Sequence, residues 1–470
     1  MKSVLPPEQV VREFAGCELG DPRREARLLE IVRKAAKDPS ASLPTMAGKQ
    51  VNRVYEFLAN EHIESEGILE AHFDQVRQRC SDEKEVYVLH DTSEFKFEGE
   101  SRSGLGPIGG GRGFLGHFAL AASASGRPLG VLGFEPWVRP EEPKRGKQVG
   151  WNKRYRDPNK ESARWPRMVE TVEERLRDTG VSVVHVADRE ADDYAFIHTV
   201  MQPGRSFVIR IRADRTLASE DGEPGEKLFA TMAKLKGLMT REVPLSKRST
   251  QGKSPRASRR HPARLARSAT LEFAATTITL QRPHAIGRDL PETQEVNVVR
   301  VFEAKPPDGE TPVEWRLMTN KPVTSVADVE RVVDIYRARW LIEEYFKALK
   351  TGCMAEARQL EDGHSLINTT AVLVPIAYLL LLLRFTARTA PDTSCRAVIS
   401  KTQQEVLEVF ADPPLPKRAT VRQALHAIAG MGGHLARNGE PGWLTLSRGL
   451  SRLLLLEVGW IAGKKSRTSR

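Results

Sequence analysis

This chain is poor in cysteine and has no apolar run long enough to cross a membrane. Its 470 residues include four Cys, and none forms a CxxC pair or a Cys/His cluster at zinc spacing. A disulfide framework and a structural zinc site are therefore not indicated, and reduced thiols suit a cytoplasmic protein. The first residues lack the apolar region of a signal peptide. The apolar stretch at 371–383 is too short to span a bilayer and predicts a buried core helix.

Acidic residues are fewer than basic ones. The chain has 72 Lys and Arg against 61 Asp and Glu, a net charge of +11 and a pI of about 9.5. This balance favours a polyanionic partner such as nucleic acid. The excess is strongest at 241–267, where nine Lys or Arg accompany a single acid, Glu242. A chain of this length is expected to hold two to four domains.

Common enzyme motifs are also missing. The match to the dinucleotide pattern GxGxxG at 104–109 contains Pro107 and is followed by more glycines without an obvious helix. It predicts a glycine-rich hairpin rather than a dinucleotide-binding turn. No Ser-His-Asp or Cys-His arrangement stands out. His90, next to Asp91, is expected to pack within a strand rather than to act as a general base.

Apolar periodicity predicts an α/β fold. Three strands in an antiparallel meander are followed by a helix and then by parallel strands, which is the order of a ribonuclease H-like sheet. The expected strands lie at 85–97, 114–122, 128–137, 181–187 and 206–212, and the helix at 160–177. We predict a helical domain at 1–70, a ribonuclease H-like core at 71–372 with a β-rich insertion at 214–322, and a helical C-terminal domain at 373–470.

The segment 336–350 places charged and aromatic groups on one side of an expected helix. At roughly 100° per residue from Tyr336, Arg339 falls near 300°, Glu343 near 340° and Lys350 near 320°. A neighbouring apolar stripe would anchor the helix on a core; it consists of Ile335, Ile342, Phe346 and Leu349. An ordinary amphipathic helix with solvated charges is the alternative. A helix break near Arg339 would move that residue off the shared face.

Two further acids follow buried strands. Asp91 comes directly after an apolar run, and Asp188 comes after another. Acids at neighbouring strand ends can face each other across the rim of a sheet and hold Mg²⁺, which prefers oxygen ligands. Each Asp alone could equally cap a turn or helix. Asp192, one turn beyond Asp188, is expected to cap or orient the turn rather than to bind metal.

These segments together resemble a known family. The stretches 91–93 and 188–192 and the spacing Tyr-x2-Arg-x3-Glu-x6-Lys at 336–350 match, in order, the DDE cut-and-paste transposases of the insertion-sequence-four family. The likeness extends over nearly the whole chain, including 19–24, 347–352, Gly432-Gly433 and Trp443. The resemblance implies metal-dependent cleavage at the ends of a mobile element, through a hairpin intermediate, and joining of the 3′ ends to target DNA.

The resemblance also implies roles for individual residues. Asp91, Asp188 and Glu343 would be catalytic and bind two Mg²⁺ or Mn²⁺ ions, while Tyr336, Arg339 and Lys350 would contact phosphates; all six lie in the matching motifs. Trp315 stands where the family uses a Trp to stack on a flipped base, although a core aromatic is the alternative. The partners implied are double-stranded DNA and a second copy in a paired-end complex, in the cytoplasm at the nucleoid.

Other DNA contacts are predicted from local patterns. Arg210 and Arg212 alternate with Ile209 and Ile211 and would share one strand face near the metals, unless they are simply solvated. The turn at 20–22 should lead into a helix that presents Arg23, Arg24 and Arg27 to DNA or to solvent. Four apolar residues at helical spacing could pair two copies or pack internally. They are Leu450, Leu453, Leu454 and Val458.

Two other functions remain open at this stage. A decayed or repurposed transposase would bind DNA without cutting it, and a general metal-dependent nuclease would cut without end specificity or joining. The three acids and the four-residue spacing are intact, which argues against decay.

Overall fold

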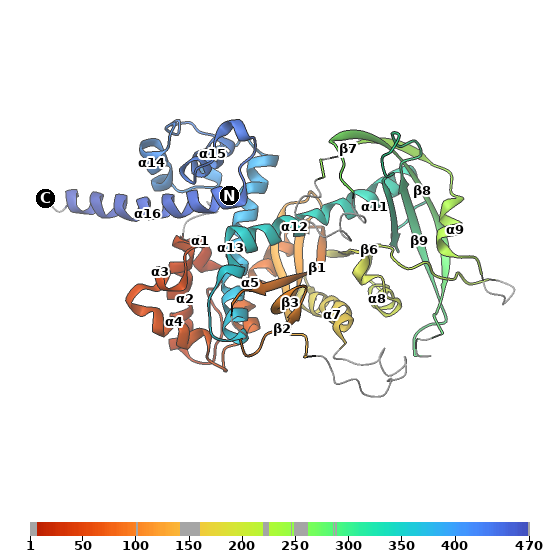
Figure 1. Ribbon diagram of the computed structural model, residues 1–470, viewed down its shortest axis with the longest axis horizontal. Helices are drawn as coiled ribbons and strands as arrows, with labels where there is room; N and C mark the ends of the chain where they lie inside the picture. The colour runs from red at the N-terminus through yellow and green to blue at the C-terminus, as the bar shows by residue number, and fades with distance from the viewer. Residues whose placement is uncertain are drawn as a thin grey trace. The chain divides into compact units, whose positions relative to one another are not determined.

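The computed structural model describes residues 7–99, 102–141, 160–219, 225–245, 247–248, 262–284, 286 and 289–468. The chain divides into two compact units (Figure 1). Unit 1 comprises residues 1–146, 170–181 and 340–470, and unit 2 comprises residues 147–169 and 182–339. The boundary falls inside one helix, α7 (Arg164–Leu176), and again between Arg339 and Trp340.

Unit 1 combines helices with a small antiparallel sheet. Its helices are α1 (Pro7–Arg12), α2 (Pro22–Lys37), α3 (Leu43–Ala47), α4 (Val51–Leu58), α5 (Ser65–Ser81), α12 (Trp340–Lys347), α13 (Gly363–Thr389), α14 (Lys401–Phe410), α15 (Val421–Met431) and α16 (Trp443–Thr468). Its strands are β1 (Glu85–Phe97), β2 (Gly106–Ile108), β3 (Gly111–Ser123) and β4 (Pro128–Trp137). The short helical turns are η1 (Gly48–Gln50), η4 (Ala348–Gly352), η5 (Ala355–Ala357), η6 (Cys395–Ala397) and η7 (Ala436–Asn438).

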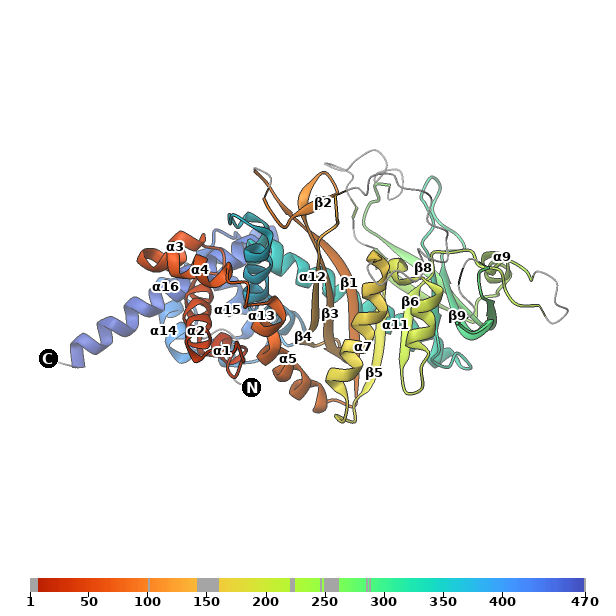
Figure 2. The same ribbon diagram turned by 90° about the horizontal axis from the view of Figure 1, so that it is seen from below.

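The unit 1 sheet is the predicted meander. β3 pairs antiparallel with β1 and, along its other edge, with β2 and β4. Figure 2 shows β1, β3 and β4 running side by side. The glycine-rich stretch at 104–109 forms β2 and pairs with β3, so the prediction of a hairpin is confirmed. His90 is fully buried in β1, in agreement with the packing role expected of it.

The core of unit 1 joins this sheet to α12 and α13. Phe118 of β3 stacks on Phe134 of β4, with centroids 4.7 Å apart, and meets Phe346 of α12 edge-on at 5.4 Å. α13 contains the apolar stretch 371–383 and is the one described helix long and apolar enough to cross a membrane. Of its most apolar window, 94% is buried inside the protein. The predicted core helix is therefore confirmed.

Unit 2 is built on a six-stranded sheet in the order β5-β6-β10-β9-β8-β7. β5 and β6 are parallel, and the other neighbours are antiparallel. The strands are β5 (Ser182–Ala187), β6 (Ser206–Arg210), β7 (Met239–Leu245), β8 (Arg267–Gln281), β9 (Thr293–Phe302) and β10 (Glu314–Thr319). The helical elements are η2 (Glu161–Ala163), the first part of α7, η3 (Arg189–Ala191), α8 (Tyr194–Val200), α9 (Leu228–Ala233) and α11 (Val326–Ala338).

Helices cover the sheet of unit 2. Apolar side chains of α7, α8 and α9 form one buried cluster with β6, β8, β9 and β10. α11 packs on β5, β6, β8 and β9 and begins with a capping box in which Ser325 and Asp328 satisfy each other's backbone groups. The β-rich character expected for residues 214–322 is thus present as β7 to β10. Of the basic segment 241–267, residues 246 and 249–261 lie outside the described residues.

Candidate active site

Asp91 lies in the middle of β1, not at a strand end. The prediction placed the acid where the apolar run stops, but β1 continues to Phe97 because alternating Phe95 and Phe97 keep one face buried. What changes at Asp91 is burial, since residues 86–90 are buried and residues 91–93 are half-buried. The Thr92 N–H donates to Asp91 Oδ1 at 2.8 Å, which fixes one oxygen of the carboxylate.

Glu343 is carried by α12, a helix that packs on β1. Ile342, Phe346 and Leu349 of the predicted anchoring stripe are buried in unit 1, and the fourth member, Ile335, is buried on α11. Glu343 itself is half-buried. Unit 1 therefore carries two of the three acids, Asp91 and Glu343, on elements in contact with each other.

Lys350 lies close to the same strand. Its Nζ donates to the carbonyl of Glu94, lies 5.0 Å from the Phe95 ring centroid and is 3.4 Å from Glu356 Oε1. Glu356 also accepts from the Lys96 N–H at 2.9 Å. The lysine is thus bound to β1 three residues after Asp91. Sequence reasoning missed Glu356, which carries no motif of its own.

The helix of the four-residue spacing is not continuous. α11 ends at Ala338, Arg339 forms its C-cap, α12 starts at Trp340, and residues 348–352 form a π-helix. A single wheel of 3.6 residues per turn therefore does not apply from Tyr336 to Lys350, and the predicted common stripe stays a prediction. The alternative of a break near Arg339 is correct.

Asp188 is the acid of unit 2. It follows β5 directly and is the N-cap of η3, where its Oδ1 accepts from the Glu190 N–H at 2.7 Å. The prediction that Asp188 ends a buried strand is confirmed, because β5 pairs in parallel with β6 up to Ala187. Partial burial and the negative charge of Asp188 raise the pKa of Glu190.

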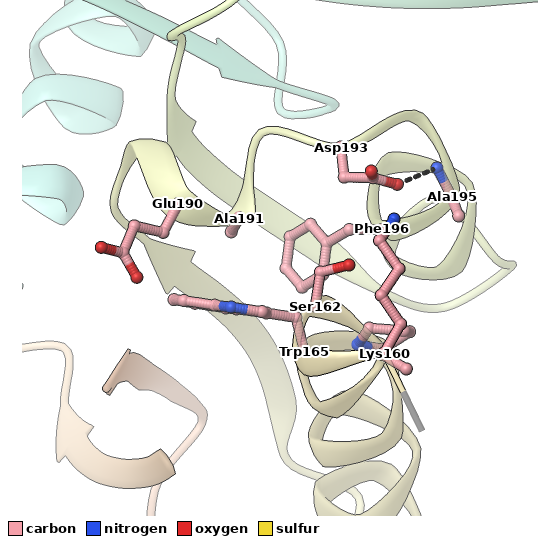
Figure 3. A pocket seen from close by; sticks show the side chains of 10 residues that line it. Lys160, Ser162, Trp165, Glu190, Ala191, Asp193, Ala195 and Phe196 are labelled. Carbon is pink, nitrogen blue, oxygen red and sulfur yellow. Dashed lines mark hydrogen bonds between the residues drawn. The ribbon is translucent and has the colours of Figure 1, made fainter. Parts of the chain in front are cut away.

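A shallow hollow of about 100 Å³ lies beside the Asp188 turn (Figure 3). The side chains of Trp165 and Phe196 form its apolar wall, with Glu190 at one end and Lys160 at the other. Asp193 also lines it and accepts from the Ala195 N–H at 3.0 Å. Glu190 and Ala191 of η3, the turn that follows Asp188, are among the residues that line the hollow.

Trp315 and Tyr336 touch within unit 2. Their ring centroids are 5.7 Å apart at an interplanar angle of 65°. Tyr336 is only 6% exposed, whereas Trp315 is half-buried on β10 and so is not a core aromatic. The indole therefore keeps an accessible part while the tyrosine braces it.

Arg210 and Arg212 lie at the end of β6 and just beyond it. β6 ends at Arg210, whose Nη2 donates to the Glu314 carbonyl at 3.3 Å. Arg212 follows the strand and is exposed, and its backbone N–H donates to Asp192 Oδ2 at 2.6 Å. Ile209 and Ile211 are buried and Arg210 is half-buried, so the expected alternation is present, although the strand ends two residues earlier than predicted. The shared face near the metals stays a prediction.

The predicted arginine helix is α2, with Asp21 as its N-cap. Arg23 pairs with Asp21 at 3.0 Å and is 91% exposed, Arg24 donates to the Leu19 carbonyl at 3.1 Å, and Arg27 pairs with Glu30 at 2.7 Å. The expected turn and helix are therefore confirmed, and exposed Arg23 extends from the first turn into solvent.

The three acids offer carboxylate oxygens, the ligands that Mg²⁺ and Mn²⁺ prefer. Asp91 and Glu343 belong to unit 1, and Asp188 belongs to unit 2. Across the described ranges, no three His, Cys, Asp or Glu side chains gather into a group that could hold a metal ion. The donor chemistry fits a hard divalent cation, and each unit by itself supplies only part of the set.

Comparison with protein-family models identifies two matches. Residues 8–63 match the transposase DNA-binding model, and residues 157–379 match the transposase DDE domain model. The first range contains α2 with its arginines, and the second contains Asp188 and Glu343 but not Asp91. DDE transposase domains generally use divalent metal ions.

Proposed function

Because this chain carries a transposase DNA-binding domain and a DDE transposase domain, we propose that it cleaves the ends of a mobile DNA element and joins the freed 3′ ends to target DNA. We further propose that it belongs to the insertion-sequence-four family and most resembles the transposon-five transposase. The observation that carries the proposal is the contact of α12 with β1, because it brings together two elements with acids at the family's positions. The third acid, Asp188, lies in the matched DDE domain.

We propose that Asp91, Asp188 and Glu343 hold two Mg²⁺ or Mn²⁺ ions. Such ions, when bound, activate the attacking oxygen and stabilise the leaving oxygen of an in-line displacement. The carboxylate of Asp91 is oriented by the Thr92 N–H, and that of Asp188 by the Glu190 N–H. Arg339 and Lys350 supply positive charge for the phosphates next to the cleaved bond.

The proposed order of steps needs no covalent bond to the protein. Water cleaves one strand at the element's end, and the freed 3′-hydroxyl then attacks the opposite strand and forms a hairpin. A second water reopens the hairpin, and the 3′-hydroxyl finally attacks target DNA. Each step transfers a phosphoryl group between oxygens, so one set of three acids can serve all four.

The function can be tested on DNA taken from beside the gene. Inverted repeats bracketing the gene would supply the substrate, and the full chain is incubated with this DNA and Mg²⁺. Hairpins followed by joined products support the proposal. Binding without cutting would support a decayed DNA-binding protein, and nicking without regard to the repeats would support a general nuclease.

Trp315 is proposed to stack on the base that leaves the duplex when the hairpin forms. Its half-buried indole and its brace, Tyr336, suit a stacking face. Stacking of one base on an aromatic ring is worth about 1–3 kcal/mol, so Trp315→Ala should slow hairpin formation about 10- to 100-fold and leave the first nick unchanged. Gel analysis of nicked and hairpin products measures both steps, and Trp315→Phe should retain most of the rate. Equal losses in the two steps would assign the indole to general stability instead.

A homodimer is proposed to pair two ends through α16. The leucines first considered for pairing, Leu450, Leu453 and Leu454, are buried within unit 1, where α16 packs on α14 and α15. Val458, the fourth residue of the predicted face, is exposed instead. Along one side of α16 it lies with two other exposed apolar residues, so that Leu455, Val458 and Ile461 are 61%, 48% and 41% exposed. Apolar side chains at this spacing form a continuous strip that a second copy can cover.

Val458→Asp should therefore weaken pairing of two copies. Burying an uncompensated carboxylate in an apolar interface costs several kcal/mol, so the complex of two DNA ends should be lost while single-end binding persists. Sedimentation of the protein with end DNA measures the two complexes. Val326→Asp places the same charge at an exposed position of α11 and should leave pairing intact. Loss of pairing in both variants would contradict a specific role for α16.

A further inference from the structure

The turn that carries Asp188 is fixed by a buried carboxylate four residues later. The side chain of Asp192 is 0% exposed, and its partner Arg215 is 8% exposed. Asp192 Oδ2 accepts from the backbone N–H groups of Arg212 and Ala213 at 2.6 and 2.7 Å. Asp192 Oδ1 accepts from Arg215 Nη1 at 2.5 Å, and the Asp192 carbonyl accepts from Arg215 Nη2 at 2.8 Å. A buried carboxylate with this many donors is held in one orientation.

Asp188 and Asp192 are joined by a short segment, so holding Asp192 in place also restrains Asp188. Only η3 separates them, and it is closed by hydrogen bonds from the Ala191 N–H to the Asp188 carbonyl at 3.2 Å and from the Glu190 N–H to Asp188 Oδ1 at 2.7 Å. Asp192 is the C-cap of η3, and its N–H returns to the Arg189 carbonyl. Because η3 is a single turn, holding Asp192 in place also limits where the Asp188 carboxylate can lie.

We call the hydrogen bonds of Asp192 with Arg212, Ala213 and Arg215 the clamp. The end of the clamp at Arg215 is anchored at the start of the β-rich region. The Arg215 carbonyl accepts from the Leu228 N–H at 2.8 Å, and Asp214 Oδ1 accepts from the Phe229 N–H at 2.8 Å. Both donors lie in the first turn of α9, which packs into the buried core of unit 2. The clamp therefore ties the Asp188 turn to a rigid element rather than to a free loop.

We infer that Asp192, held by Arg215, is a positioning residue that sets the metal-binding orientation of Asp188. The inference rests on the proposed function, because it assigns Asp192 a task only if Asp188 binds metal. Residues that hold a metal ligand in place typically change metal affinity or activity about 10- to 100-fold when they are replaced. The same carboxylate also accepts from the backbone N–H of Arg212.

Two variants separate positioning from folding. Asp192→Ala removes the hydrogen bonds that the Asp192 carboxylate accepts from Arg212, Ala213 and Arg215. Asp192→Asn keeps an oxygen for the two backbone donors but turns an NH₂ group toward Arg215 Nη1, where two donors meet. Glu303→Gln is the matched control, because it changes another buried carboxylate of unit 2 that pairs with an arginine, Arg267, and accepts from the Val313 N–H, and that is not part of the clamp. Thermal unfolding and binding of end DNA report whether each protein is folded.

The test measures Mn²⁺ binding directly, by the electron paramagnetic resonance signal of free Mn²⁺ in the presence of protein and end DNA, together with the Mg²⁺ dependence of the first nick. Asp192→Asn should raise the half-saturating metal concentration about 10- to 100-fold, and Glu303→Gln should leave it unchanged. If Asp192→Ala fails to fold, Asp192→Asn alone decides. A variant that lowers the amount of active protein but keeps the wild-type metal dependence overturns the inference.

Failure of the inference and failure of the proposed function give different results. If Asp188→Ala abolishes Mn²⁺ binding and Asp192→Asn does not change it, the metal site stands and the positioning role is wrong. If the wild-type protein binds end DNA but shows neither Mn²⁺ binding nor cleavage, the proposed function is wrong and the positioning role is rejected with it.

Discussion

Replacing Asp91, Asp188 or Glu343 by Ala should abolish cleavage of end DNA while leaving binding of that DNA nearly unchanged. Charge stabilisation by a bound metal ion is worth several kcal/mol in the transition state, and each 1.36 kcal/mol is a factor of ten, so the expected loss is about 10³-fold or more. Binding should persist because the matched DNA-binding domain, residues 8–63, contains none of the three acids. Single-turnover cleavage assays and gel shifts measure the two quantities separately.

Glu344 offers a matched control for this prediction. It neighbours Glu343 on α12, but it pairs with Lys347 at 2.8 Å and with Arg384 at 3.9 Å. Glu344→Ala should therefore keep cleavage within a few-fold of wild type, because its carboxylate pairs with two cations and is not proposed to bind metal. The Asp91 variant is the most informative of the three, since Asp91 lies outside the matched range 157–379. Persistent cleavage by Asp91→Ala would remove that residue from the site.

The strands that position the acids could be predicted because their signals are local. β1 has the bounds expected from its apolar pattern, and β5 ends next to Asp188 as its continuous apolar run suggested. The error at Asp91 has a physical cause. A strand buried on both faces can change to one buried on a single face without ending, and the sequence then changes from a continuous apolar run to alternation.

The contacts around the acids could not be predicted because they join distant parts of the chain. Lys350 meets Glu94, and Asp192 meets Arg215, through packing of separate elements. The π-helix at 348–352 and the break after Ala338 interrupt the segment that one helical wheel treated as continuous. On α16 the periodicity was correct, but which side is buried depends on α14 and α15 rather than on the helix itself.

A buried network attaches the N-terminal segment to the rest of unit 1. Glu13 and His72 are 1% and 0% exposed, and His72 Nδ1 lies 2.6 Å from Glu13 Oε2. Arg79 donates to both oxygens of Glu13, at 2.9 and 3.0 Å, and lies over the ring of Tyr378 of α13, 4.9 Å from its centroid. The Val131 N–H donates to His72 Nε2 at 3.1 Å, so Nε2 is unprotonated and the neutral ring donates its Nδ1 proton to Glu13.

This network should make unit 1 sensitive to acid. Burial alone would raise the pKa of Glu13, but the hydrogen bond from His72 and the charge of Arg79 outweigh it and lower the pKa from 4.5 to about 2. Burial lowers the pKa of His72 below 6.5. In both cases the unfolded chain binds more protons than the folded one, so stability falls as pH falls, from about 6.5 downward for His72 and between 4.5 and about 2 for Glu13.

Glu13→Gln should remove this stabilisation at neutral pH. The lowered pKa of Glu13 corresponds to about 3 kcal/mol, and breaking one side of a buried ion pair typically costs about 3–5 kcal/mol because Arg79 is left without its partner. Hydrogen exchange of α1 and α5 should rise at pH 7, and the loss of stability between pH 4.5 and about 2 should become shallower than in the wild type. Exposed Glu18→Gln is the control and should change neither. α5 also packs on β4 and α13 through buried apolar side chains. An unchanged exchange pattern in Glu13→Gln would therefore mean that this apolar packing alone holds the N-terminal segment in place.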